Sequence, residues 1–303
     1  MSSINNQLLI SLFIIILGYI SKKLKLVKEE DGPSIGRIVL NITLPCLIIN
    51  TFSTLKIDFS LIKLTLLAML YGIVMFVIGL YVFKKKERRL KGALIMLLPG
   101  FNIGLFAYPL IQAIWGQKGI KYFGMFDVGN SIVIFVLCYI IGAYFSGEEA
   151  KIEPKVIVKK LLASVPLCTY IIVVIMNLLG LKFPQLIVNL SSTVSKANAP
   201  LSLLLLGIYL SFSFHSSYLK NIASVLSIRY GIGLSLGILF FLFSPFDKMS
   251  NYTLLIGLIL PIAGAAIPFA LEFDYDEKLV GALSNLTILI SFVLIWVMVL
   301  ITT

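Results

Sequence analysis

The chain has 303 residues, of which 59% are apolar and only 13% charged, and its mean hydropathy is +1.03. This composition excludes a soluble protein of ordinary surface polarity and predicts an all-α protein that crosses a membrane several times. The formal net charge of +11 does not indicate nucleic-acid binding, because the basic residues lie in short loops between apolar segments.

Ten apolar segments are each long enough to cross a hydrocarbon core of roughly 30 Å. In chain order, the predicted spans are 5–21, 33–54, 61–83, 92–115, 119–145, 161–180, 184–212, 218–243, 250–271 and 277–301. One alternate set of loops holds 16 basic residues and the other set holds 6. Because positive charge marks the cytoplasmic side, we expect a multi-pass protein of the cell membrane with both termini outside. The basic run 84–91, KKKERRLK, also suits contact with anionic membrane lipids.

Five predicted spans lie on each side of a polar linker, residues 146–160. The linker divides the chain into a first repeat, 1–145, and a second repeat, 161–303. Since five is an odd number, the second repeat must cross the membrane in the opposite direction to the first. The sequence therefore predicts two inverted five-helix repeats, an arrangement typical of transporters.

Prolines interrupt the fourth span of each repeat. Pro99 and Pro109 lie in span 4, and Pro261 and Pro268 lie in span 9. Broken spans at corresponding positions of two repeats are the best sequence indication of a binding site near the bilayer midplane. We therefore predict that helices 4 and 9 are broken, cross each other and contribute these four prolines to a substrate site.

Polar side chains from several spans fall near the bilayer centre when depth is counted at about 1.5 Å per residue. They are Asn41, Asn102, Asp127, Asn130, Lys196 and Asn285. All except Asp127 are candidate substrate ligands, with Asn102 alternatively satisfying backbone groups freed by the break. Arg37 and Arg229 are interpreted as anchors closer to the inner interface.

Asp127 is the one carboxylate that falls inside a predicted span, and acids at such depth serve as proton or cation partners. The alternatives are a position closer to the outer interface or a structural ion pair. Lys196 would attract a carboxylate substrate, snorkel to the surface along a tilted helix, or pair with Asp127. No metal site, P-loop or nucleophile with a partnered base is present in the sequence, so neither an enzyme nor a cofactor is expected.

Residues 99–135, PGFNIGLFAYPLIQAIWGQKGIKYFGMFDVGNSIVIF, resemble the first crossover region of the auxin efflux carrier family. The family pattern has a break with Gly and Asn, a downstream proline and an F-D…N segment, here at Asn102, Pro109, Asp127 and Asn130. Residues 197–207, ANAPLSLLLLG, are similar to its seventh span. Residues 265–292, AAIPFALEFDYDEKLVGALSNLTILISF, are similar to its second crossover and last helix.

The resemblance implies a scaffold of helices 1, 2, 6 and 7 and a transport domain of helices 3–5 and 8–10. It also implies an elevator-like movement, a homodimer and a small organic anion as cargo, in a fold shared with bile acid sodium symporters. The second crossover has no acidic residue before Glu272, which disfavours sodium and leaves a proton as the candidate coupling ion. The expected function is secondary transport, with an anion channel or a sodium-coupled symporter of the bile acid type as the alternative.

Overall fold

The computed structural model describes residues 2–54, 59–146, 154–211 and 216–302, and within these ranges it contains helices and no strand. Among the described residues, six helices are long and apolar enough to cross a membrane: Ile4–Lys23, Glu29–Ser53, Ile62–Val82, Ile103–Ser146, Leu219–Phe243 and Glu277–Thr302. A bent pair, Pro154–Ala163 and Val165–Leu178, makes a seventh candidate. The predicted class, an all-α protein with several membrane spans, is confirmed, and the count of ten inverted spans stays a prediction.

The first half of the chain forms α1 (Ser2–Lys23), α2 (Gly32–Ile38), α3 (Leu44–Thr54), α4 (Ile62–Val82), α5 (Arg88–Met96), α6 (Tyr108–Ile132) and α7 (Tyr139–Ser146). Three π-helical segments lie between these helices: η2 (Val39–Thr43), η4 (Ile103–Ala107) and η5 (Val133–Cys138). Helix α6 is two helices joined at a kink, because Gly116 has φ 59° and ψ −147°. A positive φ of this kind is accessible to glycine without steric strain.

The second half forms α8 (Pro154–Ala163), α9 (Val165–Leu178), α10 (Gln185–Val194), α11 (Asn198–Tyr209), α12 (Leu219–Phe243), α13 (Lys248–Gly257), α14 (Ala266–Glu272) and α15 (Glu277–Thr302). A 3₁₀ turn, η6 (Ser195–Ala197), joins α10 to α11. Residues 147–153 of the predicted linker lie outside the described part of the chain, and α8 forms its remainder.

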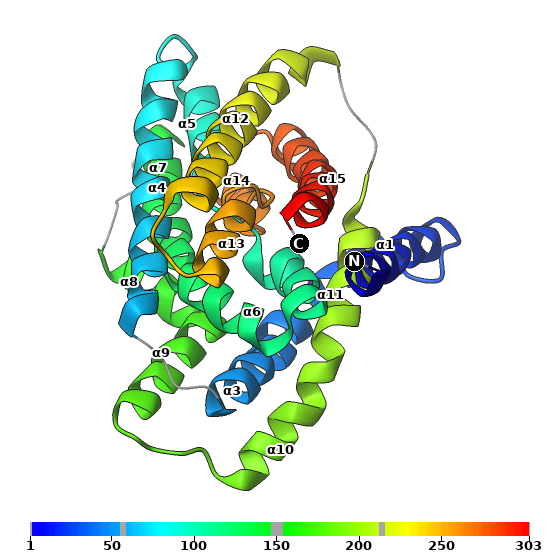
Figure 1. Cartoon of the computed structure of the whole chain (residues 1–303). Helices are drawn as coiled ribbons and strands as arrows, with labels where there is room; N and C mark the ends of the chain where they lie inside the picture. The colour runs from blue at the N-terminus through cyan, green and yellow to red at the C-terminus, as the bar shows by residue number, and fades with distance from the viewer. Residues whose placement is uncertain (1, 55–58, 147–153, 212–215, 303) are drawn as a thin grey trace.

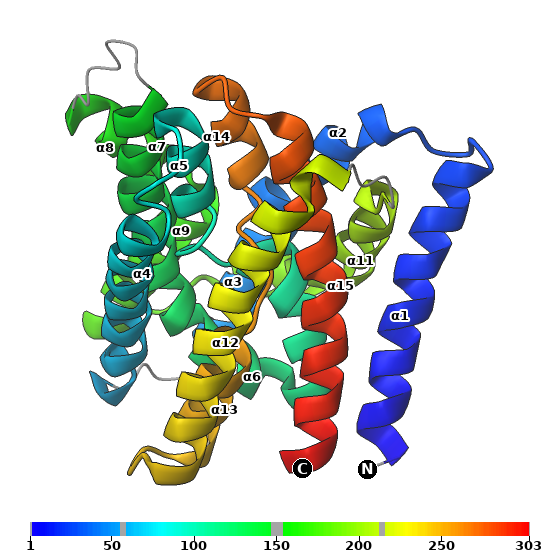
Figure 2. The same cartoon turned by 90° about the horizontal axis from the view of Figure 1, so that it is seen from above.

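Figure 2 shows both termini at one end of the molecule and the connections α1–α2, α4–α5 and α14–α15 at the opposite end. We call this opposite end the basic end, because Lys and Arg concentrate in its connections. Ion pairs fasten its elements together: Arg89 of α5 pairs with Asp274 at 2.7 Å, and Lys160 of α8 pairs with Glu272 of α14 at 2.8 Å. These contacts bring the beginning of α5 and the end of α14 to the same level.

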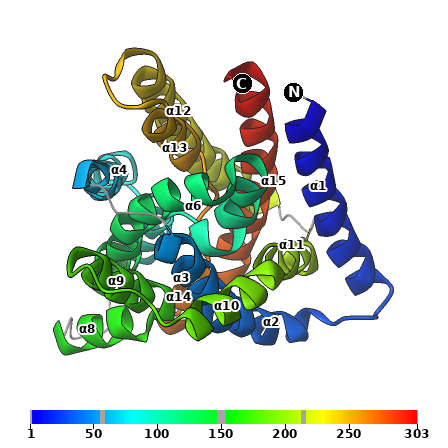
Figure 3. The same cartoon turned by 60° about the horizontal axis from the view of Figure 1, so that its bottom comes forward.

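Helix α1 packs closely along α11, as Figures 1 and 3 show. The approach depends on two glycines, since a Cβ at Gly18 would collide with the Leu204 carbonyl and one at Gly207 with the Ile15 carbonyl. Small residues at a helix interface allow backbones in a membrane to approach each other and gain van der Waals contact. This pair therefore determines the spacing of α1 and α11.

Gly207→Leu is expected to force α1 and α11 apart and to destabilise the fold by about 1–3 kcal/mol, the usual effect of overpacking. The measurement is the midpoint of thermal unfolding in detergent. Gly231→Leu on α12 is the matched control, because a Cβ there meets no atom within 4 Å. Equal midpoints for the two variants would contradict the close approach.

Candidate functional site

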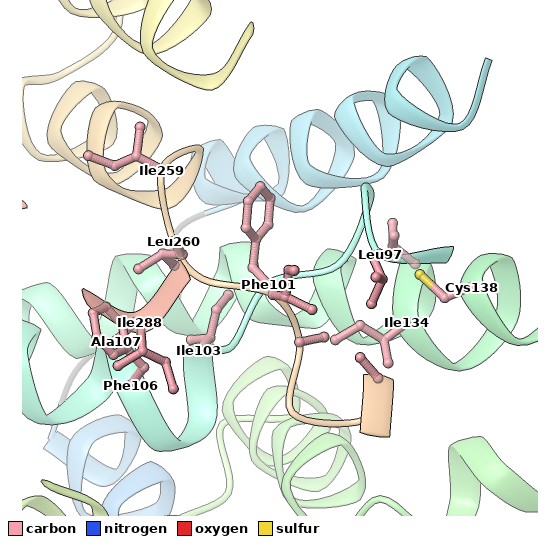
Figure 4. Packing of buried hydrophobic residues seen from close by; sticks show 14 of the residues in the cluster. Leu97, Phe101, Ile103, Phe106, Ala107, Ile134, Cys138, Ile259, Leu260 and Ile288 are labelled. Atoms are coloured by element: carbon pink, nitrogen blue, oxygen red, sulfur yellow. The ribbon is translucent and has the colours of Figure 1, made fainter. Parts of the chain in front are cut away.

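Two unwound segments, residues 97–102 and 258–265, pass each other in the middle of the molecule, and Figure 4 shows Phe101 on one and Leu260 on the other. Phe101 and Ile262 form an isolated antiparallel bridge, and the Asn102 N–H donates to the Pro261 carbonyl at 2.9 Å. The first segment separates α5 from η4 and α6, and the second separates α13 from α14. Both predicted breaks therefore exist in the structure, and they meet at the point where their backbones pair.

The four prolines explain where helices end and begin at this crossing. Pro99 and Pro261 lie inside the unwound segments, where a residue without an N–H cannot continue a helical ladder. Pro268 lies in the first turn of α14, where the missing N–H costs nothing, and Pro109 follows the π-helical segment η4 at the beginning of α6. Pro99, Pro109 and Pro261 are buried, and Pro268 is exposed.

Asn130, on the second part of α6, satisfies both backbone groups of Phe101. Its Oδ1 accepts from the Phe101 N–H at 2.9 Å, and its Nδ2 donates to the Phe101 carbonyl at 3.0 Å. A backbone group in a membrane costs several kcal/mol when it has no partner, so a two-sided clamp of this kind stabilises the break. Asn130 is buried and also donates to Asp127 Oδ1 at 3.2 Å.

Arg229 of α12 holds the carbonyl oxygens of both breaks. Its Nη1 donates to the carbonyls of Leu97 (2.9 Å), Leu98 (2.5 Å) and Gly100 (3.1 Å), and its Nη2 to that of Leu260 (2.9 Å). The guanidinium also lies over the Phe101 ring, 5.0 Å from its centroid. Only 2% of Arg229 is exposed, so the prediction that it is an interfacial anchor is wrong. A planar fork with several donors can satisfy groups from both segments at once.

Hydroxyl groups of α15 hold the second segment. Thr287 Oγ1 accepts from the Ile262 N–H at 3.2 Å, and Ser291 Oγ donates to the Ile259 carbonyl at 2.7 Å. Tyr230 of α12, next to Arg229, donates to the Thr287 carbonyl at 2.9 Å. Thr287 therefore satisfies one backbone group of the second break, whereas Asn130 satisfies two backbone groups of the first.

Asp127 lies in a buried cluster with two tyrosines. Tyr108 at the beginning of α6 donates to Asp127 Oδ2 at 2.9 Å, and its hydroxyl also contacts that of Tyr170 on α9. Both tyrosines are buried, and Asp127 is 7% exposed. The acid thus has hydrogen-bond donors on both oxygens, Tyr108 on one and Asn130 on the other, and no ion pair links it to a cation in the described part of the chain.

Asn102 caps the helix that follows the first break. Its Oδ1 accepts from the Leu105 N–H at 3.3 Å. Its Nδ2 lies 3.8 Å from where a Cβ of Gly264 would stand, and Gly264 is exposed. The amide therefore faces the edge of the crossing rather than its packed centre. A cavity of about 10 Å³ lies nearby, lined by Gly100, Ile262 and their neighbours, with room for at most one water.

The remaining candidates lie elsewhere. Asn41 in η2 and Lys196 in η6 are both exposed and do not join the cluster of Asn102, Asp127 and Asn130. Asn285 on α15 lines a separate cavity toward the basic end. Asp127 and Lys196 do not form an ion pair.

The electrostatics of the crossing are asymmetric. Carbonyls at the ends of α5 and α13 carry the negative ends of two helix dipoles, and the Arg229 guanidinium compensates both. At the positive dipole end, where η4 and α6 begin, the Asn102 side-chain oxygen accepts from the Leu105 N–H. This arrangement suits a negatively charged group beside Asn102.

Sequence reasoning missed Arg229, Tyr108, Tyr170 and Thr287. Arg229 had a signal, because ten residues separate it from the start of α12, which at about 1.5 Å per residue is near the bilayer centre. No signal in the sequence marked Tyr108 or Tyr170 as part of the site, since Tyr is common at membrane interfaces and its burial depends on tertiary packing.

Comparisons with known proteins identify the family of the chain. The profile of a family described as membrane transport proteins matches residues 3–299. An uncharacterized transporter of Methanothermobacter thermautotrophicus is 26% identical over 291 residues, covering 93% of each chain. An uncharacterized transporter of Methanocaldococcus jannaschii is 28% identical over 213 residues, covering 67% of this chain and 68% of that one. The resemblance to auxin efflux carriers is confirmed, and the chain belongs to this family of membrane transport proteins.

Proposed function

We propose that the protein is a secondary transporter that moves a small organic anion across the cell membrane by alternating access at the crossing of its two broken helices. The observation that carries the proposal is Arg229, which compensates the carbonyl ends at both breaks and leaves the dipole end at Asn102 positive. A carboxylate beside the Asn102 amide would meet a hydrogen-bond donor and a favourable field.

Ten spans follow if each broken or kinked helix is counted as a crossing. Then α5 with η4 and the first part of α6 is one span, and α13 with α14 is its counterpart in an inverted second repeat. In this arrangement α1, α2–α3, α8–α9 and α10–α11 form the scaffold, and the other helices form the transport domain. The basic end is cytoplasmic, and both termini are outside.

The packing at the crossing favours a carrier over a channel. A channel needs a continuous wetted path, whereas the crossing is closed around a cavity of about 10 Å³. Asn102, Asp127 and Asn130 are each less than one-tenth exposed. The transport domain must therefore move relative to the scaffold to expose the site, and an elevator-like displacement would do so.

Asp127 is the proton-coupling residue in this proposal. A carboxyl group among neutral donors can gain a proton without breaking an ion pair. Its partner Tyr108 belongs to the transport domain and contacts Tyr170 of the scaffold, so the cluster bridges the two parts that move. Sodium remains less favoured, because the second unwound segment, residues 258–265, contains no acidic residue.

A homodimer would cover polar groups that a single chain leaves exposed. Arg37, Asn41 and Lys196 lie exposed on α2, η2 and η6. These elements are neighbours, since η2 contacts both α2 and η6. Charged side chains that face lipid are costly, and a second copy over this face would shield them.

The test is uptake of a panel of aromatic and dicarboxylic acids into liposomes that contain the purified protein. Asn102→Ala is expected to reduce uptake of the transported acid at least tenfold, because it removes both the donor at the site and the cap of the following helix. Asn189→Ala on α10, where Asn189 is exposed, is the matched control and should transport normally. Normal uptake by a folded Asn102→Ala protein would contradict the proposed site.

A further inference from the structure

Positive charge at the basic end is concentrated in one connection, between α4 and α5. Residues 84–91, KKKERRLK, contain six basic residues and one acid. Residues 22–31, which connect α1 to α2, contain four basic residues and three acids, and the linker 146–160 has the same counts. The α4–α5 connection therefore carries an excess of five positive charges, against an excess of one in each of the other two.

The protein itself holds most of the basic side chains of this connection. Four of the six are held by other groups of the chain: Lys86 by Asn221 at 2.8 Å, Arg88 by the Tyr144 carbonyl at 2.8 Å, Arg89 by Asp274 at 2.7 Å, and Lys91 by the Phe145 ring, 5.2 Å from its centroid. The other two, Lys84 and Lys85, are exposed and pair with no acidic side chain in the described part of the chain. Glu87, the acid of the run, is exposed and makes no ion pair with a described residue either. The connection is thus fixed in place while two ammonium groups are left for an external anion.

The outer face of α4 leads along the membrane to these two lysines. Figure 1 shows α4 and its connection to α5 at the periphery of the molecule. Five apolar side chains recur every three or four residues along this face and are each at least half exposed: Leu66, Leu70, Ile73, Val77 and Tyr81. The face extends ~22 Å along the helix, which exceeds the ~15 Å depth of hydrocarbon in one leaflet. It is therefore long enough to contact a whole acyl chain.

Tyr81 places the two lysines at the depth of lipid headgroups. Its side chain is 71% exposed, and tyrosines in such positions are typical of the boundary between hydrocarbon and headgroups. Lys84 lies over the Tyr81 ring, with its Nζ 4.5 Å from the ring centroid. A contact with an aromatic ring restrains an ammonium group without neutralising its charge. Lys84 is therefore held beside the apolar face and keeps its attraction for a phosphate.

We propose that the end of α4 and the α4–α5 connection bind an anionic phospholipid, with its phosphate between Lys84 and Lys85 and an acyl chain along the outer face of α4. A zwitterionic lipid offers the same acyl chains, but its own positive group offsets the attraction to the lysines. The inference concerns the lipid that surrounds the protein, and it depends neither on the cargo nor on the way in which the cargo is moved.

The test is lipid binding to the purified full chain in an uncharged detergent, measured by native mass spectrometry. The probes are dioleoylphosphatidylglycerol, which is anionic, and dioleoylphosphatidylcholine, which is zwitterionic and has the same acyl chains. The wild type should bind the anionic lipid at least tenfold more tightly. Because a lysine near an anionic headgroup contributes about fivefold, Lys84→Gln combined with Lys85→Gln should weaken this binding at least tenfold and leave the zwitterionic lipid unaffected.

The matched control is Lys25→Gln combined with Lys28→Gln, which removes the same charge from two exposed lysines at the same end of the molecule. It should bind the anionic lipid like the wild type. An equal loss in both double variants would show that net charge alone attracts the lipid and would overturn the site, as would equal affinity of the wild type for the two lipids. If Lys84→Gln with Lys85→Gln separated a dimer into single chains and kept its lipid affinity, a second copy would occupy this face and the proposal would fail. Binding is measured without cargo, so none of these outcomes alters the proposed transport function.

Discussion

Arg229→Met is expected to remove most of the folded protein from the membrane, and it is the most damaging single substitution that the structure predicts. The change leaves the carbonyls of Leu97, Leu98, Gly100 and Leu260 without their donor. Each unpaired buried carbonyl costs about 1–3 kcal/mol, so several together approach the whole stability of an ordinary domain. The measurements are the yield of monodisperse protein in mild detergent and its thermal unfolding midpoint.

Arg37→Met is the matched control, because Arg37 is an exposed arginine in the span that begins with α2. It should express and unfold like the wild type. Arg229→Lys tests the geometry more finely, since an ammonium on a flexible stem cannot reproduce the planar fork that joins the two breaks. We expect a protein that folds with a lowered midpoint. An Arg229→Met protein with wild-type yield and midpoint would contradict the role assigned to Arg229.

Asp127→Asn is expected to abolish accumulation of the cargo driven by a pH gradient while leaving exchange of cargo across the membrane measurable. Asparagine keeps the shape of aspartate and cannot bind or release a proton in this range, so coupling is lost but the path is retained. We expect at least a tenfold reduction in accumulation. The measurement is uptake of labelled acid into liposomes with and without a pH gradient.

Glu30→Gln, which changes an exposed acid before α2, is the control and should accumulate cargo normally. Tyr170→Phe separates the acid from the scaffold without touching its direct partners, because Tyr108 and Asn130 still donate to Asp127. It should change the rate of uptake more than the pH dependence. Undiminished accumulation by Asp127→Asn would exclude this residue as the proton site.

Much of the crossing was predictable from the sequence, because breaks in apolar spans follow directly from proline chemistry. Pro99 and Pro261 predicted where backbone groups would be freed, and Asn102 and Asn130 lie there in the structure. The depth of Asp127, counted along its span, correctly predicted that it lies close to Asn130. A residue count along a helix works when the helix is regular and the relevant face points inward.

A residue count along a helix does not give the direction in which a side chain points, which explains two of the three candidates that lie apart from the crossing. Asn41 lies in the π-helical segment η2 and Lys196 in the 3₁₀ turn η6. Both kinds of turn change the number of residues per turn and therefore rotate the following face of the helix. For Arg229 the residue count gives a depth near the bilayer centre, but its role depends on carbonyls from two segments that are distant in the sequence. Long-range partners of that kind are fixed by tertiary packing.

The most direct test of alternating access at the crossing is counterflow in liposomes that contain only this protein. Vesicles loaded with an unlabelled acid of the transported class are diluted into a trace of the same acid with a label. A carrier exposes one binding site to each side in turn, so the label should accumulate transiently above its equilibrium level, and Asn102→Ala should remove the overshoot. Entry of label to equilibrium without an overshoot in the wild type would indicate a channel and contradict the account.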